Sequence, residues 1–292
     1  MKTERNILGA FLLNLGFSVF EFVGGILTGS VAIISDAIHD IGDAASIGIS
    51  YFLEKKSKKQ PDDTYTYGYS RFSVVGGLIT TLILLIGSVI MIVNAVKRMV
   101  NPTQIHYGGM ILFALVGVSV NFCAALLTRK GDSLNQKAVN LHMLEDVLGW
   151  AVVLVGAIVM RFADFPLLDP LMSIGVSLFI LIHAVGHLKE VLDLFLVKAP
   201  CEVSEIREHV SHIPGVLDVH HIHLWSMDGL HHYATMHVVT DGDPHKIKDA
   251  IREELREHGI GHATLELEAP SEPCHERQCH ISVETGHAHH HH

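Results

Sequence analysis

The sequence predicts a membrane all-α domain of six helices, followed by an α+β domain of ferredoxin-like αββαβ topology. Two observations carry this fold class. The 292-residue chain has a mean hydropathy of +0.34 and 18% charged residues, which is too apolar for an ordinary soluble protein. Its composition changes near residue 200, where the long apolar runs stop and 18 of the 23 histidines follow. We therefore expect a six-span domain at 1–199, a soluble domain at 200–270 and a Cys/His-rich tail at 271–292 that could end in an expression tag.

Six segments of the first domain are long enough to cross a bilayer, because a core of roughly 30 Å needs about 20 helical residues. They run approximately over 6–28, 31–53, 73–98, 108–129, 138–161 and 168–189. The first span contains Asn14 and Glu21, seven residues apart and so on one helical face. Buried polar residues in a membrane helix point into the bundle, so we expect them to pair with a neighbouring helix rather than to bind an ion.

The distribution of basic residues predicts the orientation of the six spans. With the N-terminus inside, twelve Lys and Arg residues lie on the cytoplasmic side and only Lys97, Arg98 and Arg161 lie near the outer side. Both termini and the soluble domain are then cytoplasmic, where thiols stay reduced and available to metal ions.

The second and fifth spans carry ionisable residues that need a partner at membrane depth. Asp36, His39, Asp40 and Asp43 lie within about a 100° arc of one helix face. In the fifth span, His142 and Asp146 repeat the i, i+4 spacing, with Glu145 turned aside or supporting a ligand. Two nitrogens and two oxygens in a tetrahedron suit zinc. The alternative is a polar face that lines a water-filled cavity without a metal ion, and spacing alone also allows Asp36 with Asp40.

After Pro200 the pattern predicts helix, strand, strand, helix and strand, with Asp243 and Pro244 starting the second helix. Histidines and thiols gather on and after the strands, and single surface histidines are mostly idle. The grouping on adjoining strands nevertheless favours a cytosolic zinc site drawn from His220, His221, His223, His237, His262, Glu268, Cys274 and Cys279.

Several function classes are disfavoured by the sequence. A formal net charge of −10 argues against nucleic acid as a partner. The four cysteines are irregularly spaced and suggest no disulfide framework, and no cleavable signal peptide is apparent. An intramembrane protease would need a nucleophile or zinc motif such as His-Glu-x-x-His, which the sequence lacks. We therefore expect a protein that is not an enzyme.

Three stretches resemble the cation diffusion facilitator family: Thr28 to Asp43, His142 with Asp146, and Pro214 to Trp225. The likeness reaches from the first span to about Cys279. It implies a homodimeric transporter with six spans in each protomer, a ferredoxin-like cytosolic domain, and exchange of Zn²⁺ for H⁺. Among such proteins the likeness is to zinc exporters, which implies zinc efflux by alternating access across a bacterial inner membrane.

The resemblance also divides the candidate residues. It implies transport ligands at His39, Asp43, His142 and Asp146, leaving Asp36 and Asp40 to support the ligands or gate access. It implies regulatory zinc ligands at His220, His237, His262 and Glu268, with Cys274 and Cys279 matching tail thiols at a wider spacing. Tyrosines stand in the 62–71 loop where some relatives have zinc-binding histidines, so we predict no zinc there. Alternatives are a zinc sensor without transport, or transport of Cd²⁺, Co²⁺ or Mn²⁺.

Overall fold

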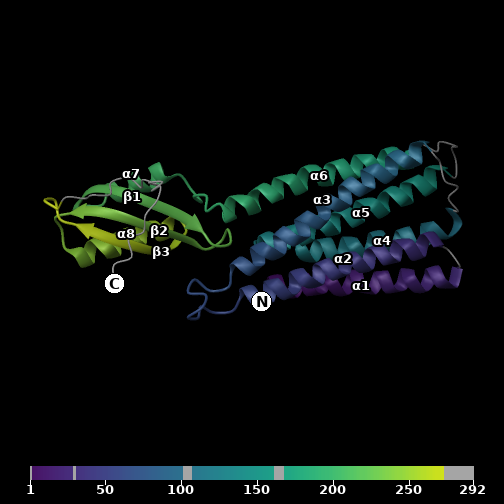
Figure 1. The fold of residues 1–292 in the computed structure, drawn as a ribbon, viewed down its shortest axis with the longest axis horizontal. Helices are drawn as coiled ribbons and strands as arrows, with labels where there is room; N and C mark the ends of the chain where they lie inside the picture. Colours follow the sequence, from purple (N-terminus) through teal and green to yellow (C-terminus); the bar gives the residue numbers. More distant parts are fainter. Residues whose placement is uncertain (1, 29–30, 101–106, 161–167, 273–292) are drawn as a thin grey trace, which may run out of the picture. The chain divides into compact units, whose positions relative to one another are not determined.

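A computed structural model describes residues 2–28, 31–100, 107–160 and 168–272. The chain divides into two compact units, residues 1–196 and 197–292, which we describe separately. The first unit is all-α and the second combines a three-stranded sheet with two helices (Figure 1). Both parts of the predicted fold class are confirmed, and the division falls three residues before the boundary that composition suggested.

Six long helices make up the described part of the first unit and lie side by side as a bundle (Figure 1). Helix α1 packs on α2 and α4, α5 packs on α3, α4 and α6, and α3 also packs on α2 and α6. The bounds are α1 Lys2–Thr28, α2 Val31–Ser57, α3 Arg71–Val100, α4 Tyr107–Thr128, α5 Leu134–Met160 and α6 Leu168–Phe195. The sequence ended the second and sixth segments at 53 and 189, whereas α2 and α6 continue for one to two further turns.

Four described helical stretches are by themselves long and apolar enough to cross a bilayer: Thr3–Gly24, Arg71–Lys97, Leu134–Gly156 and Ile174–Phe195. In α4 the described apolar stretch is the shorter Ala114–Thr128, and α2 carries three aspartates between residues 36 and 43. Without its neighbours, α2 is therefore the least suited of the six helices to a lipid environment, because each charge at membrane depth costs roughly 2.5–3.5 kcal/mol.

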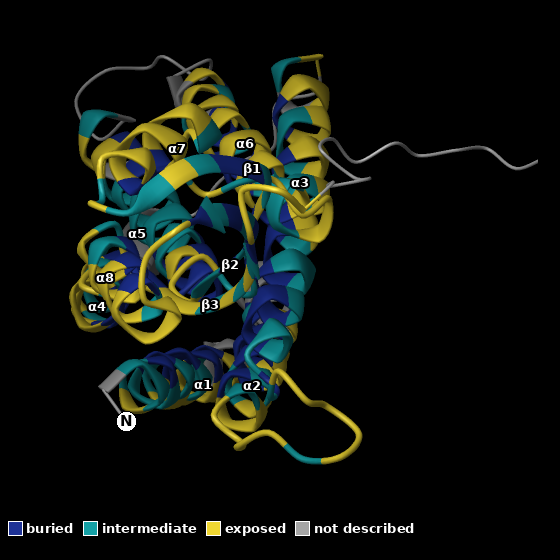
Figure 2. Cartoon of the chain, turned by 90° about the vertical axis from the view of Figure 1, so that its left-hand side faces the viewer, coloured by how far each residue is buried: buried dark blue, intermediate teal, exposed yellow. Residues whose placement is uncertain are grey.

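The bundle turns apolar side chains outward and polar ones inward, the reverse of a soluble protein. Phe52, Ile86 and Ile182 are each more than 60% exposed, whereas Asn14 and Glu21 are each 1% exposed. Buried and exposed stretches follow one another around the helices in Figure 2. Close packing between α4 and α5 needs a glycine, because a Cβ on Gly117 would lie 2.6 Å from Cδ2 of Trp150. This surface pattern fits a domain surrounded by lipid.

The second unit contains α7 Val203–Ser211, β1 Val216–Ser226, β2 His232–Thr240, α8 Pro244–Glu257 and β3 Ile260–Glu268. The sheet order is β1-β2-β3, with β1 antiparallel to β2 and β3 parallel to β2. Helix α8 makes the crossover between the parallel strands, and its cap is as predicted: the Asp243 carboxylate accepts from the His245 amide at 2.9 Å.

One apolar core joins both helices to the sheet. Ile206 and Val210 of α7 and Ile247, Ile251 and Leu255 of α8 pack on alternate strand residues such as Ala234, Met236 and Val238. His237, between two of these core residues, therefore points to the opposite face of β2. The sheet separates a helix-covered face from a face that carries imidazoles.

A β-bulge in β1 determines which residues reach each face. Between the pairs His220↔His237 and His223↔Thr235, β1 advances three residues while β2 advances two. His221 takes a φ of 50° at this point, a left-handed conformation that is uncommon for a residue other than glycine. The extra residue lets Val219 and Leu224, five apart, both enter the core while His220 faces His237. The bulge explains why apolar and polar residues alternate only loosely along β1 in the sequence.

Candidate metal centres

The membrane bundle brings three of the four predicted transport residues together. Asp43 of α2 and His142 and Asp146 of α5 each place a ligand atom within 4.8 Å of the other two. His142 Nε2 lies 3.6 Å from Asp43 Oδ1, and the two residues are 3% and 7% exposed. The i, i+4 spacing puts His142 and Asp146 on one face of α5, as expected. Asp43 and His142 are buried and Asp146 is half-buried. One imidazole and two carboxylates in this position form a donor set suited to a divalent cation.

The fourth predicted residue, His39, lies in α2 one helical turn before Asp43, and its side chain is outside the described part of the chain. The same holds for the side chain of Asp36. Asp40 is half-buried and does not belong to the group formed by Asp43, His142 and Asp146. The i, i+4 pair of Asp36 with Asp40 thus stays a prediction without geometry, whereas Asp43 lies opposite α5.

Neighbouring helices make one contact to this group and one beside it. Asn14 of α1 donates from Nδ2 to Asp146 Oδ2 at 3.3 Å, which confirms that the polar face of the first helix pairs with another helix. Such a bond orients one carboxylate oxygen and leaves the other able to face a cation. Beside the group, the Ser88 hydroxyl of α3 donates to Glu145 Oε1 at 3.4 Å. Sequence spacing alone could not identify α1 and α3 as the neighbours.

A second group, which we call the sheet group, lies on the sheet face opposite the core. It consists of His220 of β1, His237 of β2 and Glu268 at the end of β3. His237 Nδ1 lies 2.6 Å from Glu268 Oε1, and His220 Nε2 lies 3.3 Å from Glu268 Oε2. His220 and Glu268 are each 6% exposed. The β1 bulge places His220 directly beside His237, so backbone geometry forms this group. These are three of the six predicted cytosolic ligands.

The structure places His262 away from this group. His262 pairs with Tyr233 in the β2–β3 register, and Glu268 lies six residues further along β3. At about 3.3 Å per residue this separation is roughly 20 Å. Cys274 and Cys279 lie outside the described residues. Two carboxylates that sequence reasoning missed lie close instead: Asp218 Oδ2 is 3.2 Å from His220 Nδ1, and Glu266 Oε2 is 3.4 Å from His237 Nε2. Asp218 lies two residues before His220, and Glu266 lies two residues before Glu268, so each pair shares a strand face. This spacing could have identified both carboxylates from the sequence.

A third group was missed entirely by sequence reasoning. His209 of α7 and Glu254 and His258 at the end of α8 place their ligand atoms within 4.8 Å of one another. The i, i+4 spacing of Glu254 and His258 was visible, but the approach of α7 to α8 depends on packing.

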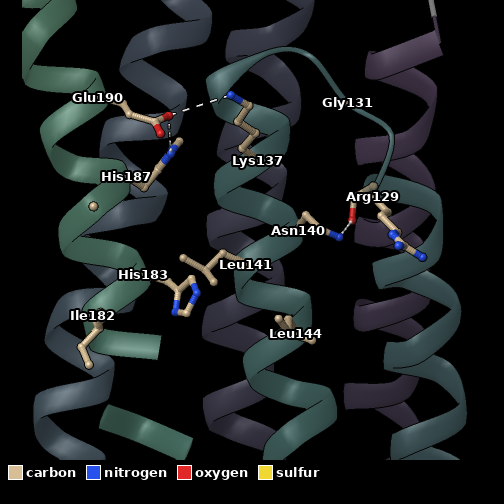
Figure 3. Close-up of a pocket in the computed structure, with 12 residues that line it drawn as sticks. Arg129, Gly131, Lys137, Asn140, Leu141, Leu144, Ile182, His183, His187 and Glu190 are labelled. Atoms are coloured by element: carbon tan, nitrogen blue, oxygen red, sulfur yellow. Dashed lines mark hydrogen bonds and ion pairs between the residues drawn. The ribbon is translucent and has the colours of Figure 1, made fainter. Parts of the chain in front are cut away.

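The membrane unit also holds a cavity of about 510 Å³ among α4, α5 and α6, and its lining mixes charged side chains with leucine and isoleucine. In Figure 3, Glu190 lies between Lys137 and His187, with its Oε2 3.9 Å from Lys137 Nζ and 3.8 Å from His187 Nδ1. Asp43, His142 and Asp146 are not among the residues that line it. The cavity and the buried group are therefore different sites.

A bundle of membrane-crossing helices that buries carboxylates beside imidazole, joined to a small α+β domain, defines a multi-pass membrane protein equipped to handle cations. Comparison with known proteins identifies its family. Residues 7–196 match the cation efflux transmembrane domain, and residues 199–269 match the cytoplasmic domain of cation efflux proteins. The chain belongs to the cation efflux family, also called the cation diffusion facilitators.

Relatives match along nearly the whole chain. It is 32% identical over 301 residues to "Zinc transporter ZitB" of Escherichia coli (strain K12), covering 100% of this chain and 95% of that protein. It is 28% identical to the "Cadmium, cobalt and zinc/H(+)-K(+) antiporter" of Bacillus subtilis (strain 168), with 99% and 97% covered. It is 30% identical to "Cation efflux system protein CzcD" of Alcaligenes sp. (strain CT14), with 92% and 88% covered. These names describe transporters and not enzymes, in line with the prediction that this chain is not an enzyme.

Proposed function

We propose that this protein exports Zn²⁺ from the cytoplasm in exchange for H⁺, binding the ion at His39, Asp43, His142 and Asp146. The observation that carries the proposal is the group of Asp43, His142 and Asp146, which two membrane helices contribute and of which Asp43 and His142 are buried. Zinc transport in the names of full-length relatives supports the choice of cargo. His39 lies one turn from Asp43, at the spacing by which His142 and Asp146 share a face.

Charge balance makes this donor set suitable for a divalent ion inside a membrane. Two carboxylates cancel the charge of one Zn²⁺, so the loaded site is close to neutral where an unbalanced charge is costly. Imidazole completes a tetrahedron of two nitrogens and two oxygens. Protonation of an imidazole near pH 6.5 removes the lone pair that binds metal, so release of zinc and uptake of protons become one event.

The membrane potential explains why protons are useful to such an exporter. Moving Zn²⁺ outward against an inside-negative potential of 100 mV costs about 4.6 kcal/mol, from roughly 2.3 kcal/mol per charge. Each proton that enters recovers about half of that cost. Alternating access, in which the site opens to one side at a time, then couples the two movements.

We assign the sheet group a regulatory role within a homodimer in a bacterial inner membrane, with both termini cytoplasmic. Zinc at His220, His237 and Glu268 would join all three strands of the domain and favour the transporting conformation. Glu268 already bridges the two imidazoles. The orientation is supported by the twelve basic residues expected on the cytoplasmic side. His262, Cys274 and Cys279 remain predicted ligands, and a partner protomer or the tail would have to complete the set.

The decisive experiment is a flux assay in proteoliposomes with an imposed pH gradient. We expect His39→Ala and Asp146→Ala each to abolish proton-driven zinc uptake. Asp132→Ala is the control, because this exposed carboxylate lies just before the helix of Asp146 and does not belong to the group. Full transport by both alanine variants would contradict the proposal.

The alternatives are separable in the same vesicles. A sensor without transport would bind zinc and show no flux under any gradient. Cadmium and cobalt are the second candidates for cargo, because the name of the Bacillus subtilis relative includes both. Comparing Zn²⁺, Cd²⁺, Co²⁺ and Mn²⁺ establishes the selectivity. We expect zinc to be transported with the highest kcat/KM.

A further inference from the structure

The residues His209, Glu254 and His258 belong to neither of the two proposed zinc sites. Its three side chains meet through one atom each. His209 Nδ1 lies 2.9 Å from Glu254 Oε1 and 3.2 Å from His258 Nε2. The third side of the triangle, from His258 Nε2 to Glu254 Oε1, measures 3.5 Å. Two imidazole nitrogens and a carboxylate oxygen thus converge on one point.

The dimensions of this triangle match those of three ligands on one zinc ion. Zinc binds imidazole nitrogen and carboxylate oxygen at about 2.0–2.2 Å, and in a tetrahedron such bonds place neighbouring ligand atoms roughly 3.3 Å apart. The observed sides of 2.9, 3.2 and 3.5 Å bracket this value. Without an ion, the contacts of His209 to Glu254 and to His258 are hydrogen bonds, and the one between the imidazoles has one ring nitrogen as donor and the other as acceptor. A cation at the centre of the triangle would replace these protons and bind all three atoms at once.

The local structure holds these ligands on rigid elements. His209 precedes Val210, and Glu254 precedes Leu255, and both apolar side chains are at most 1% exposed in the same core. Glu254 and His258 are one helical turn apart, so they project from the same side of α8. The donor triangle is therefore fixed by the packing of α7 and α8, and ion binding requires little rearrangement.

We propose that His209, Glu254 and His258 form a further binding site for a divalent transition-metal ion of the zinc class, which links α7 to α8. The fourth position is open to solvent, because the three side chains are 45%, 28% and 19% exposed. Such a site exchanges its ion with the surroundings. It lies on the helical layer of the domain, so it is distinct from the sheet group, which faces the other side of the sheet.

Zinc binding at this site slows local opening of the two helices. The opening equilibrium falls by a factor of 1 + [Zn²⁺]/Kd, so tenfold excess over Kd slows amide exchange about tenfold. The test is hydrogen–deuterium exchange of the full chain in lipid nanodiscs, with and without Zn²⁺. A His220→Ala/His237→Ala background removes two sheet ligands, and the tail is identical in every sample. The readout is binding alone, so failure of zinc transport would leave this proposal standing.

We expect zinc to protect peptides within 203–211 and 244–257 in the background protein. The protection should disappear in His209→Ala/His258→Ala and persist in the matched control His212→Ala/His245→Ala. The control also removes one exposed imidazole from the end of α7 and one from α8, and neither residue belongs to the triangle. If the double variant exchanges faster throughout the domain without zinc, Glu254→Gln, which keeps the size of the side chain, provides the second test. Equal protection in test and control variants, or none in the background protein, would overturn the proposal.

Discussion

His221 has the backbone conformation on which the sheet group depends. Its positive φ accompanies the β1 bulge, and the bulge sets His220 against His237 instead of the core. The strands of the sequence predicted a wider group of histidines with Glu268, and the family resemblance selected His220, His237, His262 and Glu268 from it. No turn residue in the sequence marked the bulge. Positive φ at a residue other than glycine persists only where the surroundings enforce it, here through core residues on both sides of the bulge.

Asn14 connects α1 to the group formed by Asp43, His142 and Asp146. We predict that Asn14→Ala raises the KM for zinc about tenfold in the vesicle flux assay, because Asp146 loses the donor that orients it. Asn121→Ala is the matched control: Asn121 is a buried asparagine of α4 whose side-chain atoms have no hydrogen-bond partner within the described chain. Transport by Asn14→Ala with an unchanged KM would show that the Asn14 contact does not support metal binding.

The Cys201 thiol has a raised pKa, whereas a cysteine that binds metal does so as the thiolate. Burial, aided by the nearby Glu205 carboxylate, raises the pKa of the Cys201 thiol. In a variant that keeps only this cysteine, we expect alkylation by iodoacetamide to reach half its maximal rate above pH 8.5, the approximate pKa of a free thiol. The midpoint shifts to higher pH because the thiolate is the reactive form and burial disfavours the thiolate. Glu205→Gln should lower the midpoint only partly, since burial is the larger cause. A midpoint at or below 8.5 would contradict the assignment.

At the scale of elements, the ends of α2 and α6 were harder to predict than their existence. Apolar runs mark spans well, but Glu54, Lys55 and Lys56 read as the end of one, whereas α2 continues to Ser57. Glu54 tolerates its 4% exposure because three groups donate to it: Ser73 Oγ at 2.7 Å, Ser133 Oγ at 3.3 Å and Asn135 Nδ2 at 3.4 Å. Partners contributed by distant segments are invisible in a local pattern. The contact of α7 with α8 was missed for the same reason.

Glu54 joins the ends of α2, α3 and α5, so its loss should loosen all three. We predict that Glu54→Ala lowers stability by about 1–3 kcal/mol, because buried donors lose their acceptor. Glu54→Gln keeps an acceptor oxygen and should cost less. Thermal unfolding in detergent measures both. The exposed Asp132 provides the control Asp132→Ala, which should leave the midpoint unchanged. Equal midpoints for Glu54→Ala and wild type would show that the cluster is not stabilising.

At the scale of the whole molecule, each described group draws its ligands from a single unit. If zinc on the sheet group favours zinc binding in the membrane, linkage requires the reverse effect to be equal. We predict that His220→Ala/His237→Ala weakens zinc binding at the transport site by the same factor by which Asp146→Ala weakens binding at the sheet group. Calorimetric titration of the purified protein measures both. A factor of one in each direction would refute the regulatory role and leave transport intact.

Helix α2 also has a consequence for biosynthesis. Its three aspartates make it a poor candidate to enter lipid alone, and the residues that meet Asp43 come from α5, about a hundred residues later in the chain. At about 5–20 residues per second, translation leaves α2 without these α5 residues for roughly 5–20 s. During that interval α1, already synthesised, and α3, made next, are able to shield it, because both pack against α2 in the finished protein. The group formed by Asp43, His142 and Asp146 thus comes together only after most of the membrane domain has been made.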